Sequence, residues 1–361
     1  MITPAHITAI RPYIPGKPID ELERELGIEH SVKLASNENP LGPSPKALDA
    51  VSEALSSINR YPDGEGYHLK NAIAAKWKVR PEEILLGNGS NELIEIVIRT
   101  YLMPGDETVM ATPSFVVYDS TVRAAGGISC NVPLKDGRHD LSAMAERITE
   151  KTRLVFIANP NNPTGTTVSH AEVSLLFESL PDNCLLVMDE AYFEYVTDPD
   201  FPDSISFLRQ GHDLLILRTF SKAYGLAGLR IGYAIGPRQV IKTMNRIRQP
   251  FNTNAPAQAA ACAALKDNEH LNRVLEINEK GKSYLEAELN RLGQFFLPTQ
   301  ANFIYINLPD GFSSETLYNS LLRKGVIVRP AGPDVIRVTI GLPEENRRFI
   351  NAFEDILGVF Q

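Results

Sequence analysis

The stretch LRTFSKAYGLAGLRIGY (Leu217–Tyr233) begins as an apolar run and continues as a loop of small residues. A short apolar run that ends in polar residues is typical of a buried strand in a parallel sheet. Lys222 stands directly after this run, and Arg230 follows it. A lysine among backbone amides and near a second cation can have its pKa lowered, which suits a Schiff-base nucleophile. The stretch therefore indicates either a reactive lysine at the end of a strand or a solvated surface lysine.

Runs of the same form recur along the chain, and helical stretches separate several of them. The other runs are EEILLGNGS, ETVMATPSF, RLVFIANPNNPTG and CLLVMDEAYFEY. Strands that alternate with helices predict an α/β fold with a mainly parallel sheet covered on both faces. In such sheets ligands bind beyond the carboxyl ends of the strands, where Asn162, Asp189 and Lys222 all fall.

The patterning divides the chain into three parts. Residues 1–40 are expected to form an N-terminal arm, with a short helix in PIDELERELGI, and part of a small domain. Residues 41–255 carry the strand–helix alternation of a large domain. Residues 256–361 begin with a long, charge-laced helical stretch and continue with shorter strands, which predicts a smaller α+β domain joined by the helix.

Composition excludes several classes of protein. The 361 residues carry a net charge of −8, with no long basic run, so a small molecule is a better partner than a nucleic acid. The cysteines Cys130, Cys184 and Cys262 lack CxxC spacing, so neither a metal site nor a disulfide framework is expected, and a reducing cytoplasm fits. Because no signal sequence and no run of about 18 apolar residues is found, neither secretion nor a membrane span is expected.

Pyridoxal phosphate (PLP) chemistry requires more than a lysine. The cofactor acts as an electron sink only while its pyridine nitrogen stays protonated, which requires a nearby carboxylate. Asp189 in LLVMDEAY is the candidate, and a helix N-cap is its alternative role. Tyr192 and Asn162 could donate hydrogen bonds to the phenolic oxygen of the cofactor. The NNPTG segment around Asn162 also suits an ordinary turn.

A phosphate group requires amides, hydroxyls and a cation. The segment GNGSNE opens a helix after a strand, so its free N–H groups can bind an anion at the positive end of the helix dipole. The candidate phosphate ligands are Gly89, Ser90, Asn91, Ser221 and Arg230. Phe115 in TPSFVVY could stack on the pyridine ring, and core packing is the alternative.

Taken together, these motifs resemble those of fold-type-I PLP-dependent aminotransferases. GNGSNE, NPNNPTG, DEAY, SKAYGLAGLRIG and IRVTIG occur in the order of that family, and the resemblance covers nearly the whole chain. The segments RPYIPGKPIDELERELG, KLASNENPLGPSP, RYPDG and ANFIYI are similar to its histidinol-phosphate branch. The resemblance implies a large domain with a mainly parallel seven-stranded sheet sandwiched by helices, and a smaller α+β domain.

The resemblance also assigns roles to the residues already singled out. It implies that Lys222 forms the Schiff base with pyridoxal 5'-phosphate and moves the proton, and that Asp189 pairs with the pyridine nitrogen. Asn162 and Tyr192 would contact the phenolic oxygen, and Phe115 would stack on the ring. Phosphate contacts would come from Gly89, Ser90, Asn91, Ser221 and Arg230.

Substrate binding and assembly follow from the same resemblance. Arg337 in VIRVTIG matches the arginine that holds an acidic group of the substrate, and Arg329 in VIVRP would supply a second guanidinium for a phosphate dianion. A surface ion pair is the alternative for Arg329. Tyr13 would close over the substrate, and Asn37 and Asn162 are further expected substrate contacts. Tyr61 in RYPDG would reach the partner's site in a homodimer, or else would pack locally in its turn.

The implied reaction transfers an amino group between histidinol phosphate and 2-oxoglutarate, giving imidazole acetol phosphate and glutamate, in histidine biosynthesis. Two alternatives retain the cofactor: an aromatic amino-acid aminotransferase, and a PLP lyase or decarboxylase that acts on a phosphorylated amino acid. A non-catalytic binding module of this fold would be expected to lose Lys222 or Asp189, and both are present.

Overall fold

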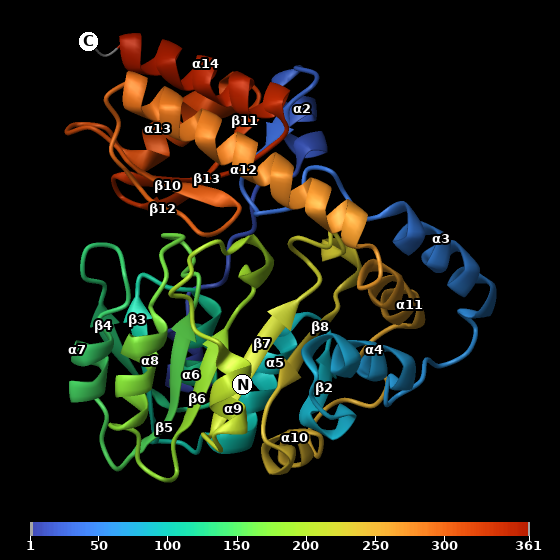
Figure 1. The fold of residues 1–361 in the computed structure, drawn as a ribbon. Coiled ribbons are helices and arrows are strands. Elements are labelled where there is room, and N and C mark those ends of the chain that lie inside the picture. Colours follow the sequence, from blue (N-terminus) through green and yellow to red (C-terminus); the bar gives the residue numbers. More distant parts are fainter. Residues whose placement is uncertain (1–2, 360–361) are drawn as a thin grey trace.

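A seven-stranded sheet forms the centre of the larger part of the molecule (Figure 1). The structure is a computed structural model that describes residues 3–359. In spatial order the strands are β2 (Ile84–Gly87), β8 (Gly232–Ile235), β7 (Leu214–Thr219), β6 (Leu185–Asp189), β5 (Thr152–Ala158), β3 (Glu107–Thr112) and β4 (Ile128–Pro133). Strands β7, β6, β5, β3 and β4 are parallel, whereas β8 runs antiparallel to both β7 and β2. The predicted mainly parallel sheet is confirmed.

Both faces of this sheet are apolar, so its strands are continuous hydrophobic runs. Along β6, Leu186 and Met188 belong to one core, and Leu185 and Val187 belong to the other. Successive side chains of a strand point to opposite faces, so a helix layer must cover each face.

Two groups of helices form these layers. One face packs against α3 (Pro45–Ala54), α4 (Tyr67–Trp77), α7 (Leu141–Glu146), α8 (His170–Phe177), α9 (Ser204–Arg209) and α11 (Ala255–Ala264). The other face packs against α5 (Ser90–Tyr101), α6 (Val117–Ala124) and α10 (Arg238–Met244). The sheet is therefore sandwiched by helices, as expected.

A smaller α+β unit stands over the carboxyl ends of the central strands (Figure 1). Its four-stranded antiparallel sheet has the order β12 (Arg329–Gly332), β13 (Val335–Thr339), β10 (Phe303–Asn307) and β9 (Phe296–Leu297). Its helices are α12 (Asn268–Arg291), α13 (Ser314–Arg323) and α14 (Pro343–Val359).

The N-terminal segment joins both units. The short helix α1 (Ala5–Thr8) contacts α6 of the large unit. The helix α2 (Ile19–Leu26) packs through Leu22 against Ile327 of the small unit, and β1 (Val32–Lys33) pairs in parallel with β11 (Val326–Ile327). The connection between α1 and α2 therefore passes from one unit to the other.

The helical stretch expected after residue 256 differs from a single continuous helix. It is divided into α11 and α12, and Asp267 caps the start of α12 by accepting a hydrogen bond from the His270 amide. Alanines of α11 lie in the core of the large unit, whereas Leu285 and Leu289 of α12 lie in the core of the small unit. The passage between the two cores thus lies within α12. The predicted boundary between residues 255 and 256 falls at the start of α11, before this passage.

Candidate active site

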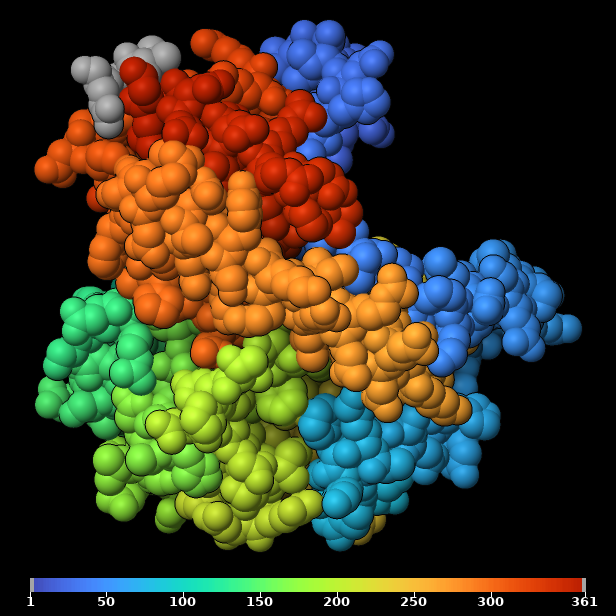
Figure 2. Space-filling model, turned by 45° about the horizontal axis from the view of Figure 1, so that its top comes forward, coloured from blue at the N-terminus to red at the C-terminus, as the bar shows by residue number. Residues whose placement is uncertain are grey.

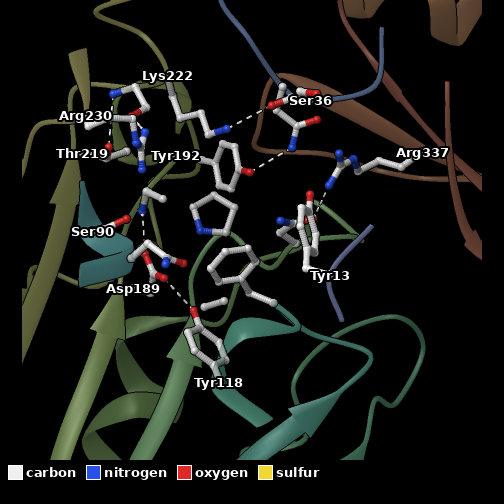
Figure 3. A pocket seen from close by; sticks show the side chains of 18 residues that line it. Tyr13, Ser36, Ser90, Tyr118, Asp189, Tyr192, Thr219, Lys222, Arg230 and Arg337 are labelled. Carbon is white, nitrogen blue, oxygen red and sulfur yellow. Dashed lines mark hydrogen bonds between the residues drawn. The ribbon is translucent and has the colours of Figure 1, made fainter. Parts of the chain in front are cut away.

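A cavity of about 220 Å³ lies where the two units meet, at the carboxyl ends of β5, β6 and β7. Figure 3 shows side chains from the large unit, the small unit and the N-terminal arm pointing into it. Its lining residues are Tyr13, Ser36, Asn37, Ser90, Asn91, Phe115, Tyr118, Ala158, Pro160, Asn162, Asp189, Ala191, Tyr192, Thr219, Ser221, Lys222, Arg230 and Arg337. Most of the residues singled out from the sequence are therefore in one place.

Asp189 is a buried carboxylate at the end of β6. Tyr118 donates its hydroxyl hydrogen to Oδ2 at 2.6 Å, and the amide of Ala191 donates to Oδ1 at 3.2 Å. Burial raises the pKa of this carboxyl group to about 6. A cationic ring nitrogen beside Asp189 would stabilise the ionised form that burial disfavours.

Lys222 presents a buried amine to the same cavity. Its Nζ donates to the Ser36 carbonyl oxygen at 3.1 Å and lies 5.6 Å from the centre of the Tyr192 ring. Burial and, secondly, the nearby Arg337 cation lower the pKa of this amine to about 8. A larger share of neutral amine is therefore present near pH 7 than for an exposed lysine.

An anion-binding corner is formed where α5 begins. Gly89 precedes the helix with φ = 77°, and a Cβ at this position would lie 2.6 Å from Nη2 of Arg230. The first amides of a helix have no partners within it, and Gly89 supplies no side chain to cap them. Arg230 Nη1 donates to Oγ of Ser221 at 3.3 Å. Helix amides, a hydroxyl and a guanidinium therefore converge here, as a phosphate requires.

Tyr192 is held by an asparagine of the N-terminal segment. Asn37 Nδ2 donates to the Tyr192 hydroxyl oxygen at 2.9 Å, and the Asn37 Oδ1 accepts from the Thr339 hydroxyl at 3.1 Å. Asn302 also donates to the backbone oxygen of Asn37, which has φ = 55°. Asn37 thus connects a cavity residue of the large unit to β13 of the small unit.

Arg337 lies at the side of the cavity formed by the small unit. Its Nη1 donates to Oδ1 of Asn162 and its Nη2 to the Ala35 carbonyl oxygen, both at 2.6 Å. Its Nε is buried and has no hydrogen-bond partner within residues 3–359. Tyr13 stands beside it in Figure 3. A substrate anion in the cavity would find a nearly buried guanidinium here.

Three residues singled out from the sequence do not line the cavity. Gly89 lies directly behind the Arg230 guanidinium. Arg329 is turned to the arm: its Nη1 donates to the Ile14 carbonyl oxygen at 2.8 Å, and its guanidinium lies 5.2 Å from the centre of the Tyr13 ring. Tyr61 is 82% exposed and stacks on Phe251 with ring centres 4.7 Å apart, outside the cavity of its own chain.

Sequence reasoning missed Tyr118, Thr219 and Ser36. Tyr118 lies in the first turn of α6, three positions after Phe115, which precedes the helix, and the two ring centres are 5.6 Å apart in an edge-to-face arrangement. That aromatic pair at helical spacing was the available signal for Tyr118. Thr219 accepts from the Ser221 amide, and Ser36 acts through its carbonyl oxygen, so neither contact has a signature in the sequence.

The residues that surround the cavity fit PLP. An amine of lowered pKa, a buried carboxylate, an anion-binding corner and an aromatic ring surround one cavity. No group of three metal-binding side chains occurs among the described residues. Within the same residues, no helix has the length and apolarity needed to cross a membrane.

Comparisons with known proteins agree with this site. The family model "Aminotransferase class I and II" matches residues 29–353. Histidinol-phosphate aminotransferase of Moorella thermoacetica is 48% identical over 97% of this chain and 92% of its own length. That of Anaeromyxobacter sp. is 44% identical over 99% of each chain. Among solved structures, the histidinol-phosphate aminotransferase of Sinorhizobium meliloti in complex with pyridoxal-5'-phosphate has a TM-score of 0.91 and 28% identity, covering 99% of this chain and 98% of its own. The chain therefore belongs to the aminotransferase class I and II family, in its histidinol-phosphate aminotransferase branch.

Proposed function

We propose that this protein transfers an amino group between histidinol phosphate and 2-oxoglutarate, with PLP as cofactor, in histidine biosynthesis. The observation that carries the proposal is the presence of Lys222, Asp189 and Arg337 around one cavity. Lys222 would react with the aldehyde of PLP, Asp189 would pair with its ring nitrogen, and Arg337 would bind an anionic group of the substrate. The names and the identity of the relatives support the choice of substrate.

Lys222 and Asp189 would have separate roles in the reaction. When bound, PLP supplies an electron sink for the negative charge that develops at the substrate α-carbon. Asp189 would keep the ring nitrogen protonated by remaining ionised beside it. Lys222 Nζ, with its pKa lowered to about 8, would take the proton from the substrate α-carbon and deliver it to C4′ of the cofactor.

The remaining residues bind and orient. Gly89, Ser90, Asn91, Ser221 and Arg230 would hold the cofactor phosphate, and Phe115 would cover the ring. Tyr192 and Asn162 would donate to the phenolic oxygen. Arg337, oriented by Asn162 and the Ala35 carbonyl oxygen, would grip the substrate phosphate or the carboxylate of glutamate.

The active unit is proposed to be a homodimer in which Tyr61 completes the partner's site. Tyr61 belongs to a group of exposed apolar side chains on and near α3: Leu48, Leu55, Ile58, Tyr61, Tyr67 and Phe251. Figure 2 shows the α3 segment standing out from the body of the large unit. A second copy of the chain would remove this apolar surface from water. The cytoplasm remains the proposed location.

The first test is spectroscopic. Protein purified with PLP should show the visible absorbance of a cofactor attached to an amine, and borohydride should fix the cofactor on Lys222. The Lys222→Ala variant should be colourless after dialysis, whereas an unchanged spectrum would contradict the assignment.

The second test concerns the substrate. The values of kcat/KM are compared for histidinol phosphate, phenylalanine, tyrosine and threonine phosphate. We expect histidinol phosphate to be preferred over each of the others by about tenfold or more. Phenylalanine and tyrosine would offer Arg337 a singly charged carboxylate in place of a phosphate dianion, and threonine phosphate lacks the imidazole ring and carries an additional carboxylate. Equal values for phenylalanine would favour the aromatic aminotransferase alternative.

A further inference from the structure

A cluster of buried charged and aromatic side chains lies behind the cavity, on the opposite face of the central sheet. Successive residues of a strand point to opposite faces. Asp189 and Thr219 line the cavity. Their chain neighbours Glu190 and Arg218 therefore point away from it, and the Arg218 guanidinium lies against Trp77 of α4. None of the roles proposed above uses this cluster.

At the centre of the cluster, Arg218 and Glu190 form a buried ion pair. Nε and Nη2 of Arg218 donate to Oε2 of Glu190 at 2.9 and 2.7 Å, and the Ser204 hydroxyl donates to Oε1. The side chains of Arg218 and Glu190 are 3% and 0% exposed. If only one charge of such a pair is removed, the other stays buried without compensation.

Two aromatic rings pack against the guanidinium, edge to face with each other. The Trp77 and Phe193 ring centres lie 3.9 and 3.7 Å from Cζ of Arg218. The Trp77 indole N–H in turn donates to the Tyr233 hydroxyl at 2.8 Å. Arg218 is thus held by the Glu190 carboxylate and by the two neighbouring rings of Trp77 and Phe193.

Each of three cavity residues has a direct chain neighbour in this cluster. Glu190 follows Asp189, Phe193 follows Tyr192, and Arg218 precedes Thr219. Adjacent residues share a planar peptide unit, so a displacement of the backbone at a cluster residue also displaces the backbone of the cavity residue joined to it. A charge on Glu190 also opposes the ionisation of Asp189. The other groups acting on that carboxylate are the Tyr118 hydroxyl, the Ala191 amide and the Lys222 amine, and all three favour its ionised form.

We propose that Arg218 is a positioning residue for the cofactor site. By clamping Glu190 and Phe193 behind the sheet it fixes Asp189 and Tyr192 in the cavity, and its charge cancels that of Glu190. The inference rests on the proposed function, because the site it supports is the PLP site. Arg218 itself lies outside the cavity lining and contacts no reacting group.

The test measures the PLP affinity of the dimer-forming full chain after the cofactor has been removed, at temperatures well below unfolding and from pH 5 to 9. Arg218→Met keeps an apolar stem of similar length and leaves Glu190 unpaired. We expect the dissociation constant for PLP to rise about tenfold or more. The pH below which binding weakens should also rise above that of the unaltered protein, because an unpaired Glu190 favours protonation of Asp189.

Adding Glu190→Gln to Arg218→Met should restore most of the affinity and the original pH limit, because the carboxylate next to Asp189 is then absent. The buried Glu194 also loses the Arg218 cation in both variants, and burial favours its neutral form, so it does not separate them. Met144→Ala on α7 serves as the matched control, because Met144 is fully buried in the same core but packs near α8 and β3. It should lower the thermal midpoint and leave PLP affinity unchanged.

Two results would overturn the inference: unchanged PLP affinity in Arg218→Met, or an equal loss of affinity in Met144→Ala. If Arg218→Met does not fold, Arg218→Lys is tested instead. Lysine retains the positive charge but cannot donate the two parallel hydrogen bonds of the guanidinium to Glu190. It should weaken PLP binding with an unchanged pH limit, and unchanged affinity would reject the inference. Failure of the unaltered protein to bind PLP would instead reject the proposed function.

Discussion

At the scale of single residues, the electrostatic environment of Lys222 leads to a pH prediction. Burial and the Arg337 cation lower the pKa of its amine to about 8, and only the neutral amine attacks the aldehyde of PLP. The rate of covalent attachment to the cofactor-free protein should therefore rise with pH to a midpoint near 8 and level off above it. Stopped-flow absorbance measures this rate directly.

Arg337→Met tests the cause of that midpoint. Removing the cation favours the ammonium form of Lys222, so the midpoint should move to higher pH and attachment should slow at pH 7. A midpoint near the ordinary lysine value of 10.5 in the unaltered protein, or an unmoved midpoint in the variant, would contradict this account.

At the scale of elements, the segment between α1 and α2 extends from the large unit to the small unit and brings Tyr13 into the cavity lining. Arg329 on β12 holds this arm through the Ile14 carbonyl oxygen and the Tyr13 ring. In Arg329→Met the arm loses both contacts. We expect KM to rise several-fold for glutamate and histidinol phosphate alike, at about constant kcat, because ordering the arm then costs binding energy.

The exposed Arg323 of α13 provides the matched control, since Arg323→Met removes an arginine from the same unit without touching the arm. The same experiment decides the role of Arg329 predicted from the sequence. Direct contact with the substrate phosphate would confine the loss to histidinol phosphate, and that outcome would contradict an anchoring role.

At the scale of the whole molecule, the exposed position of Tyr61 leads to a subunit-mixing prediction. Tyr61→Ala and Lys222→Ala homodimers should each be nearly inactive. A mixed dimer has one site in which an intact Lys222 meets the intact Tyr61 of the other chain. Refolding an equal mixture should therefore recover about a quarter of the unaltered activity, since half of the dimers are mixed and each has one good site.

Activity that stays at the level of the separate variants would contradict a shared site. Leu175→Ala serves as the control for mixing with Lys222→Ala, because Leu175 is exposed on α8. In that mixture half of the sites keep Lys222, so about half of the unaltered activity is expected.

The fold and much of the site could be predicted from local patterns. Asp189 and Lys222 each follow a buried strand, and neighbouring parallel strands end at one edge, so their convergence did not depend on any side-chain contact. The Gly89 turn before α5 was recognisable because glycine and a helix start stand together. Tyr118 was not recognised, because its contact with Asp189 joins α6 to β6 across 71 positions.

Contacts across the two units were the least predictable. The break between α11 and α12 lies in a stretch whose composition is helical throughout, and its cause is the cap at Asp267. The contact between Arg329 and Ile14 joins residues 315 positions apart. The sequence around Arg329 contains nothing that distinguishes an arginine that binds the substrate from one that holds the N-terminal arm.

The sequence by itself determined the alternation of strands and helices and the edge of the sheet at which the candidate site residues lie. It also determined the amine, the carboxylate and the glycine turn that would bind PLP. These depend on hydrophobic periodicity and chain order, which are local properties. Only the tertiary structure decided that Arg337 is oriented by Asn162, that Arg329 holds the arm, and that Arg218 is clamped behind Asp189. Burial and the partners of each charge depend on residues distant in the chain, so they emerge only when the chain is folded.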